Sequence, residues 1–100
     1  MPLTLFYYPS FERSRKNLDT IQKRIVKRIL KALLVYYSHD YRLSEVQKVE
    51  TRFFYKQLRK PYYEAGVENK IRVLIEREKS TCFAILAGNH DQIKRFLATH

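Results

Sequence analysis

The feature that most constrains the fold is a pair of strand-like segments in the last third of the chain. Apolar β-branched residues occupy every second position from Ile71 to Ile75, which is the pattern of a half-buried strand. Residues 81–87 form a continuous apolar run, which indicates a central strand covered on both faces. The polar segment 76–80 separates the two runs, so the sequence predicts a hairpin with its tip there.

Two residues with acid–base or charge chemistry lie at the ends of these strands. Arg72 falls near the start of the first strand, and His90 follows the end of the second. The predicted hairpin would therefore bring a guanidinium and an imidazole close together. The chain has 20 Lys and Arg against 10 Asp and Glu, a net charge of +10, which is typical of proteins that bind a polyanion. Together these features suggest that the chain binds a phosphodiester and cleaves it.

The first third of the chain predicts one strand and two helices. Residues 3–8 are rich in apolar and aromatic side chains and stop at a proline, which is typical of a short strand. Ser10 is the expected N-cap of a short helix that ends near Leu18. Asp19 can cap a longer helix that runs to about Tyr37.

The middle of the chain is harder to assign. A helix is expected from Ser44 to about Leu58, although residues 51–55 also suit a strand. The segment 62–68 is expected to be a loop, and Asp91 can cap a last helix. The resulting order β-α-α-(α)-β-β-α predicts one α+β domain over the 100 residues. We expect a small antiparallel sheet with helices packed on one face.

The predicted helix from residue 19 to residue 37 is amphipathic. Apolar residues recur every four positions along one side, and cations fill the opposite side. Solvation of the charges, contact with a polyanion and contact with a membrane surface are all compatible with such a face. Of these we expect contact with RNA and no membrane partner. The apolar positions are Ile21, Ile25, Ile29 and Leu33, and the cations are Lys23, Arg24, Lys27, Arg28 and Lys31.

Cysteine and histidine usage limits the cofactor chemistry. Cys82 is the only cysteine and lies in an apolar run, so we expect a small buried side chain rather than a nucleophile. His39 and His100 have no metal-ligand companions nearby in the sequence. No metal, cofactor or small-molecule ligand is expected. The N-terminal residues do not resemble a secretion leader, so a cytoplasmic location is expected.

Three segments resemble the RelE/ParE superfamily of small toxins from type II toxin–antitoxin pairs. Residues 6–18 are similar to the opening strand and the Pro-Ser-Phe…Lys…Leu helix start of that family. Residues 70–73 are similar to its Ile/Leu-Arg-Val strand, and residues 87–91 to a Gly-x-His-Asp ending. One departure is Thr81-Cys82-Phe83, where many members carry Tyr-Arg.

The resemblance implies a toxin fold, a cognate antitoxin partner and one of two activities. In the RNA-cleaving branch, the 2′-hydroxyl of messenger RNA in the ribosomal decoding site attacks the adjacent phosphate without a metal. Arg72 matches the arginine of that family and would stabilise the phosphate charge. His90 would transfer protons, since imidazole can accept and donate near neutral pH.

Further cations and aromatics are candidates for RNA binding. Aromatic rings among cations suit base stacking and contact with the backbone of single-stranded RNA. The antitoxin is expected to lay an acidic, extended or helical segment over the basic face. The predicted RNA-binding residues are Lys23, Lys27, Arg28, Lys56, Arg59, Lys60, Tyr62, Tyr63 and Arg77.

Two other functions remain compatible with the sequence. A ParE-like inhibitor of DNA gyrase would share the fold without catalysing a reaction, and the missing Tyr-Arg pair favours it. His90 in its Gly-x-His-Asp context favours the nuclease instead. A basic nucleic-acid-binding module without toxicity would need only the cationic helix.

Overall fold

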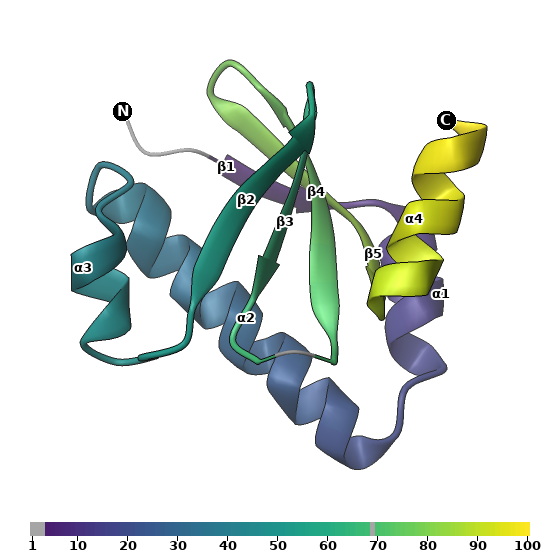
Figure 1. Cartoon of the computed structure of the whole chain (residues 1–100), viewed down its shortest axis with the longest axis horizontal. Helices are drawn as coiled ribbons and strands as arrows, with labels where there is room; N and C mark the ends of the chain where they lie inside the picture. The colour runs from purple at the N-terminus through teal and green to yellow at the C-terminus, as the bar shows by residue number, and fades with distance from the viewer. Residues whose placement is uncertain (1–3, 69) are drawn as a thin grey trace.

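Five strands form one open sheet, and four helices pack around it (Figure 1). The structure is a computed structural model, and it describes residues 4–68 and 70–100. The predicted strand at 3–8 is present over Thr4–Tyr7, and its position 3 lies outside the described residues. The elements are β1 (Thr4–Tyr7), α1 (Pro9–Lys16), α2 (Thr20–Ser38), α3 (Leu43–Gln47), β2 (Phe54–Arg59), β3 (Tyr62–Gly66), β4 (Arg72–Glu78), β5 (Thr81–Gly88) and α4 (His90–Thr99).

The sheet has the strand order β1-β5-β4-β3-β2. Strand β1 runs parallel to β5, and every other neighbouring pair is antiparallel. The predicted hairpin is confirmed as β4 and β5, with Arg77 opposite Cys82 and Arg72 opposite Gly88. A bulge at Ile85 interrupts the pairing between these strands. The α+β class with a mostly antiparallel sheet is therefore confirmed.

Helix α1 is held against the bulged strand by its serines. The Ser10 hydroxyl donates to the carbonyl oxygen of Ile85 at 2.6 Å, and the Ala87 amide donates to the Ser14 hydroxyl at 2.9 Å. The prediction that Ser10 caps the helix is wrong, because the N-cap is Tyr8 and the first helical residue is Pro9. Proline suits this first position since its missing N–H has no helical partner there.

Helix α2 begins as predicted. The Asp19 carboxylate accepts from the Gln22 amide, and the Gln22 side chain accepts from the Asp19 amide, which completes a capping box. Ile21 was expected to be buried but is 69% exposed. It lies in the first turn, beyond the sheet residues that cover the rest of the stripe. The buried residues of α2 are Ile25, Val26, Ile29, Ala32, Leu33 and Tyr37.

The predicted helix from Ser44 to Leu58 is wrong. Helix α3 has five residues, and the chain then forms β2 and β3, so that the expected loop at 62–68 is mostly strand. The alternative assignment of 51–55 to a strand is closer, because β2 starts at Phe54. Strand β2 pairs with β3, and β3 also pairs with β4. Residue propensities alone did not separate this arrangement from a helix.

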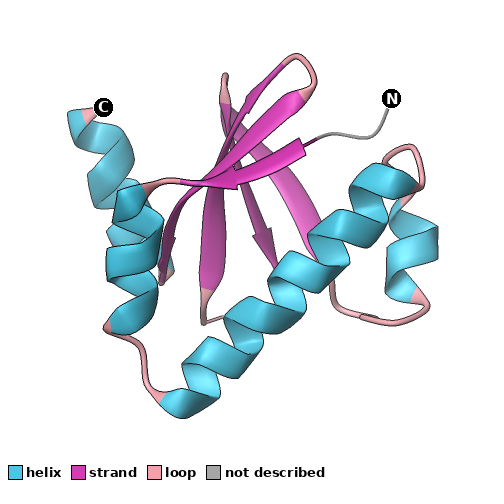
Figure 2. Ribbon diagram, turned by 180° about the vertical axis from the view of Figure 1, so that it is seen from behind, coloured by secondary structure: helices cyan, strands magenta, loops and turns pink. Residues whose placement is uncertain are grey.

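The two faces of the sheet have different coverings (Figures 1 and 2). We call the side under α2 the α2 face; it carries alternate β4 residues Val73, Ile75 and Arg77. We call the other side the α4 face; it carries Arg72, Leu74 and Glu76 of the same strand. A second apolar cluster there joins Leu74 and Ile85 to Ile93 of α4. Strand β5 is thus covered on both sides, as its apolar run predicted.

Candidate functional site

Arg72 and His90 lie side by side, as the sequence predicted. Arg72 is the first residue of β4, and His90 is the first residue of α4. The guanidinium Nη1 is 3.3 Å from Nδ1 of the imidazole. The antiparallel pairing of β4 with β5 produces this proximity, because Arg72 faces Gly88 two residues before His90. The prediction that the two groups would meet is confirmed.

The contact fixes which imidazole nitrogen carries a proton. A guanidinium has five N–H donors and no acceptor, so Nδ1 of His90 must accept in this hydrogen bond. The neutral ring then carries its proton on Nε2. The side chain of His90 is exposed to solvent, whereas the side chain of Arg72 is 20% exposed. The pair therefore combines an accessible imidazole with a guanidinium anchored in the sheet.

A third residue, Glu64, completes the group, and the sequence analysis did not identify it. Its Oε1 accepts from Nη1 of Arg72 at 2.9 Å, and its side chain is only 2% exposed. Oε2 of Glu64 and Nε of Arg72 are buried and have no hydrogen-bond partner within the described residues. The segment was expected to be a loop, so nothing placed this carboxylate opposite β4.

Phe54 and Gly66 shape the floor beside Arg72. The guanidinium carbon lies 5.3 Å from the centre of the Phe54 ring, within the range of a cation–π contact. Gly66 pairs with Phe54 across the strands, and a β-carbon at this glycine would lie 2.6 Å from the ring. A side chain at position 66 would therefore push the ring out of place. The glycine at this position allows Phe54 to support Arg72.

The start of α4 holds His90 in place. Asn89 is the N-cap: its side chain accepts from the Gln92 amide at 2.9 Å, and the Gln92 side chain accepts from the Asn89 amide at 2.8 Å. The prediction that Asp91 is the cap is wrong, since Asp91 lies in the first turn. Its carboxylate is still favourably placed at the positive end of the helix. A cavity of about 350 Å³ opens beside His90, lined by Gln22, Lys70, Ile71, Asn89, His90 and Asp91.

Part of the predicted RNA-binding set lies on the α4 face. Lys56 of β2 is exposed and lies opposite Glu64 of β3 in the backbone register of the two strands. Arg59 and Tyr62 lie at the far end of the same face. Tyr62 is opposite Glu76, which is four residues, or about 13 Å, along β4 from Arg72. Arg59 donates to the carbonyl oxygen of Leu97 at 2.9 Å, which ties it to the end of α4. Lys60 lies in the turn between β2 and β3.

The rest of the set lies elsewhere. Arg77 is on the α2 face, with its guanidinium 4.3 Å from the centre of the Tyr41 ring. Tyr63 is on the same face and stacks on Tyr55. Arg28 makes two hydrogen bonds to the Glu50 carboxylate, at 2.8 and 2.7 Å. Lys23 and Lys27 line a different cavity from that of His90. The structure thus does not unite the predicted residues on one surface, and their role in RNA binding stays a prediction.

Two carboxylates reduce the positive charge of the α4 face away from Arg72. Glu76 has a raised pKa because burial disfavours its charge, and the neighbouring Glu78 adds repulsion. The Tyr8 hydroxyl donates to Glu76 at 3.5 Å. Burial and the same glutamate raise the pKa of Tyr8. Cations therefore lie at both ends of this face, with Lys56 near Arg72 at one end and Arg59 near Glu76 at the other.

Three further observations concern a metal site, a membrane-spanning helix and the single cysteine. Within residues 4–68 and 70–100, no group of three or more His, Cys, Asp or Glu side chains is arranged to hold a metal ion. None of the described helices is both long and apolar enough to cross a membrane. Cys82 is buried, and burial raises the pKa of its thiol, which agrees with the predicted packing role.

Comparison with known proteins identifies the fold. No protein family profile matches the sequence, and no curated protein matches it in sequence. Among solved structures, the chain is similar to the RelB–RelE antitoxin–toxin complex from Methanococcus jannaschii, with a TM-score of 0.62 and 16% identity over 91% of this chain and 96% of that one. The E. coli DinJ–YafQ toxin–antitoxin complex gives 0.61 and 16% identity over 93% and 98%. A copper-bound mutant toxin from Helicobacter pylori gives 0.60 and 14% identity over 91% and 98%.

These similarities cover nearly the whole of each chain. The resemblance inferred from the sequence segments is therefore confirmed at the level of architecture. The protein has a RelE-like toxin fold.

Proposed function

We propose that the protein is the toxin of a type II toxin–antitoxin pair and cleaves messenger RNA on the ribosome. The observation that carries this proposal is the contact between Arg72 and His90 on the α4 face. The fold supports a toxin role because its structural neighbours are toxins and toxin–antitoxin complexes. The fold alone does not choose between activities. The arrangement of the two side chains favours cleavage.

The reaction consistent with this pair is attack by a ribose 2′-hydroxyl on the adjacent phosphorus. A new P–O2′ bond forms, the P–O5′ bond breaks, and the products are a cyclic phosphate and a 5′-hydroxyl. The transition state carries extra negative charge on the phosphate oxygens. Nη2 of Arg72 makes no hydrogen bond within the described residues, so this end of the guanidinium is free to bind a phosphate oxygen. Such charge-assisted bonds are strongest when the donor is fixed in advance.

His90 would move the proton. When phosphate draws Arg72 toward itself, Nδ1 of His90 loses its present donor and can accept the 2′-hydroxyl proton. The imidazolium formed then protonates the leaving 5′ oxygen and returns to its neutral form. Both proton transfers are thereby balanced on one side chain, without a metal.

Glu64 would position Arg72 rather than contact RNA. Its carboxylate is buried behind the guanidinium and bonds to Nη1, the nitrogen that also reaches His90. This bond limits the rotamers of Arg72. Because Glu64 keeps its bond to Nη1, only the bond from Nη1 to His90 has to break when phosphate binds, so the reorganisation is small.

The test is cleavage of messenger RNA by the full-length protein on translating ribosomes, with the new ends mapped and their chemistry determined. His90→Ala should lower the rate by at least about 100-fold, the usual effect of removing a general acid–base group. His39→Ala is the matched control, because that exposed histidine lies at the end of α2. The nuclease proposal fails if His90→Ala and Arg72→Lys cleave at the wild-type rate while remaining folded.

The second candidate is a non-enzymatic inhibitor of a protein target, such as DNA gyrase. The observation that favours it is the buried bond between Arg72 and Glu64, which can serve structure alone. The sequence departure at Thr81-Cys82-Phe83 agrees, because Cys82 is buried and supplies no phosphate ligand there. Expression in bacteria separates the two candidates. Growth arrest with intact RNA and altered plasmid supercoiling would support the inhibitor.

A further inference from the structure

The cavity beside His90 is built from three separate segments of the chain. Its walls come from the first turn of α2, from the two residues before β4 and from the start of α4. The buried residue Ile71 supplies apolar surface, and its volume of about 350 Å³ is in the range of small-ligand sites. Because His90 is itself one of the walls, a nucleoside that presents its ribose to His90 has this cavity beside it.

Hydrogen-bond donors of the cavity are fixed by the two capping boxes. The side-chain oxygen of Gln22 accepts from the Asp19 amide at 3.0 Å, so the other atom of this side-chain amide, Nε2, remains a donor. The side-chain oxygen of Asn89 accepts from the Gln92 amide at 2.9 Å, which leaves Nδ2 as a donor in the same way. Lys70 adds an exposed ammonium that has no ion-pair partner in the described structure.

Asp91 supplies the acceptor, as the one carboxylate among the described residues that line the cavity. It is exposed and makes no ion pair with any other described residue. A free carboxylate can accept two parallel N–H bonds. Guanine presents two such donors side by side, N1–H and the N2 amino group, together with the acceptors O6 and N7. The other three bases each present fewer donors on this edge, so the set of groups in the cavity is most complementary to guanine.

We propose that this cavity is a guanine-binding subsite and that the protein cleaves RNA after guanosine. Asp91 would accept from N1 and N2 of the base, and Lys70 with the two side-chain amides would donate to O6 and N7. The 2′-hydroxyl and 3′-phosphate of the same guanosine would then face His90 and Arg72. The inference rests on the proposed function for the position of cleavage. Recognition of the base itself involves no bond breaking and is tested without it.

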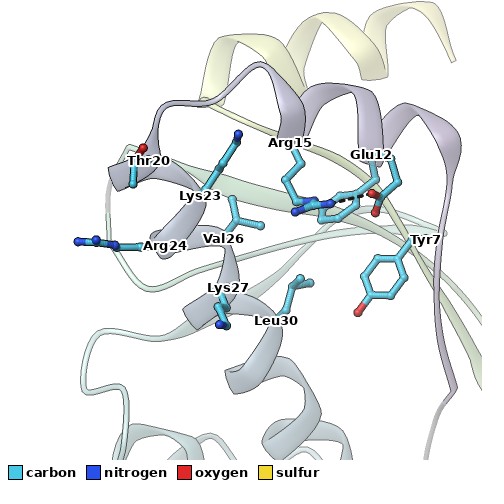
Figure 3. Close-up of a pocket in the computed structure, with 10 residues that line it drawn as sticks. Tyr7, Glu12, Arg15, Thr20, Lys23, Arg24, Val26, Lys27 and Leu30 are labelled. Carbon is cyan, nitrogen blue, oxygen red and sulfur yellow. Dashed lines mark hydrogen bonds and ion pairs between the residues drawn. The ribbon is translucent and has the colours of Figure 1, made fainter.

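A larger groove between α1 and α2 is the competing place for an anionic ligand (Figure 3). Its volume is about 510 Å³, and it shares no lining residue with the cavity beside His90. Its one carboxylate among the described lining residues, Glu12, is bonded to Arg15 at 2.8 Å. The groove can therefore attract phosphate, but it has no free carboxylate with which to recognise guanine. The cations that line it are Arg15, Lys23, Arg24 and Lys27.

The test is binding of nucleoside 3′-monophosphates to the full-length protein, which requires neither a ribosome nor cleavage. Isothermal titration calorimetry compares the affinities of the guanine, hypoxanthine, adenine, cytosine and uracil nucleotides. We expect the guanine nucleotide to bind about tenfold more tightly than each of the others, which corresponds to about 1.4 kcal/mol at 25 °C. The hypoxanthine nucleotide isolates the N2 amino group, because it differs from the guanine nucleotide in that group alone.

A substitution at Asp91 tests how the base is recognised. Asp91→Asn replaces one acceptor by a donor and should lower the preference for the guanine over the adenine nucleotide about tenfold, because asparagine suits adenine. Asp40→Asn is the matched control, since Asp40 is an exposed aspartate in the turn after α2. Chemical-shift mapping of the ¹⁵N-labelled protein should place the bound nucleotide at residues 70–72 and 89–91 and not in the α1–α2 groove.

Guanine selectivity that Asp91→Asn removes and Asp40→Asn retains supports the proposal. Equal affinity for the five nucleotides, tighter binding of guanosine 5′-monophosphate than of the 3′-monophosphate, or shifts confined to the α1–α2 groove would overturn it. Mapped RNA ends provide a separate measurement. Cleavage after bases other than guanosine would overturn the proposed position of cleavage. Selective binding without any cleavage would support the subsite and contradict only the nuclease proposal, so the two failures are distinguishable.

Discussion

Arg72 and Arg77 are five residues apart on one strand, yet they occupy different environments. Arg72 lies on the α4 face against a buried carboxylate and an exposed imidazole. Arg77 lies on the α2 face, where its guanidinium stacks on the ring of Tyr41. Other tyrosines at the edge of the hydrophobic core lie next to Tyr41. An odd spacing on a strand places two side chains on opposite faces. The two arginines therefore differ in role because of their positions along β4: Arg72 is a candidate catalytic residue, and Arg77 is a packing residue.

The two faces of the sheet also differ in whether their buried polar groups have hydrogen-bond partners. On the α2 face, the hydroxyls of Tyr37 and Tyr55 are 3.2 Å apart and next to the core. On the α4 face, Glu64 and Arg72 each keep a buried polar atom without a partner in the described structure. Incompletely satisfied buried groups are costly, and a catalytic role is one of the reasons for which proteins retain them. This difference directs the nuclease hypothesis to the α4 face.

The largest effect is expected from breaking the Arg72–Glu64 pair. Arg72→Met should lower the free energy of unfolding by about 3–5 kcal/mol, because it leaves a buried carboxylate unpaired. Adding Glu64→Leu should recover most of this loss, since an apolar pair of similar volume removes the uncompensated charge. Urea denaturation measures both changes. A double variant as unstable as Arg72→Met would show that the pair is not the cause.

Alkaline pH should act on the α2 face. Burial raises the pKa of Tyr55 to about 12, and burial also raises the pKa of Tyr37. Above the ordinary tyrosine pKa of about 10, the unfolded chain loses these protons while the folded chain retains them, so stability should fall as pH rises. Ultraviolet titration should show fewer than the 8 tyrosines ionising before unfolding. Tyr55→Phe should reduce the alkaline loss of stability.

A smaller effect is expected at the start of α4. Asn89→Ala removes the side-chain acceptor for the Gln92 amide and should cost about 1 kcal/mol of stability. Because His90 follows the cap, the variant should also reduce RNA cleavage through a less ordered imidazole. Asn89→Asp, which retains an acceptor, should restore both. A cleavage rate unchanged in Asn89→Ala would show that the cap does not position His90.

The smallest effect is expected at Arg77. Arg77→Met should cost about 1 kcal/mol, the usual size of a cation–π contact that is partly buried. RNA cleavage should be unchanged, in contrast to Arg72→Lys. Loss of cleavage in folded Arg77→Met would contradict the division between the two faces and would restore Arg77 as an RNA-binding residue.

The sequence predicted the parts of the fold that depend on local pattern. The N-cap at Asp19, the hairpin of β4 and β5, and the closeness of Arg72 to His90 all follow from patterns within single segments or neighbouring strands. The errors are of a different kind. The N-caps at Tyr8 and Asn89 each lie two residues before the expected cap, because Pro9 takes the first helical position of α1 and Asn89 caps α4 in place of Asp91.

Strands β2 and β3 could not be predicted from local pattern. Their aromatic residues are compatible with helix or strand, and the pairing of β2 with β3 and of β3 with β4 decides between the two. Glu64 was missed for the same reason, because it lies in the middle of β3. The faces on which Lys56, Tyr62 and Tyr63 lie were also not predicted, since these residues belong to β2 and β3.

The sequence by itself determined the charge of +10, the amphipathic α2, the β4–β5 hairpin and the meeting of a guanidinium with an imidazole. These features depend on periodicity and on one hairpin between consecutive strands. Tertiary structure alone decided that Glu64 anchors Arg72, that Arg77 lies against Tyr41, and that α1 and α2 enclose a cationic groove. The physical reason is that each of these depends on how strands pair or helices pack, which sets the neighbours of a side chain independently of its residue type.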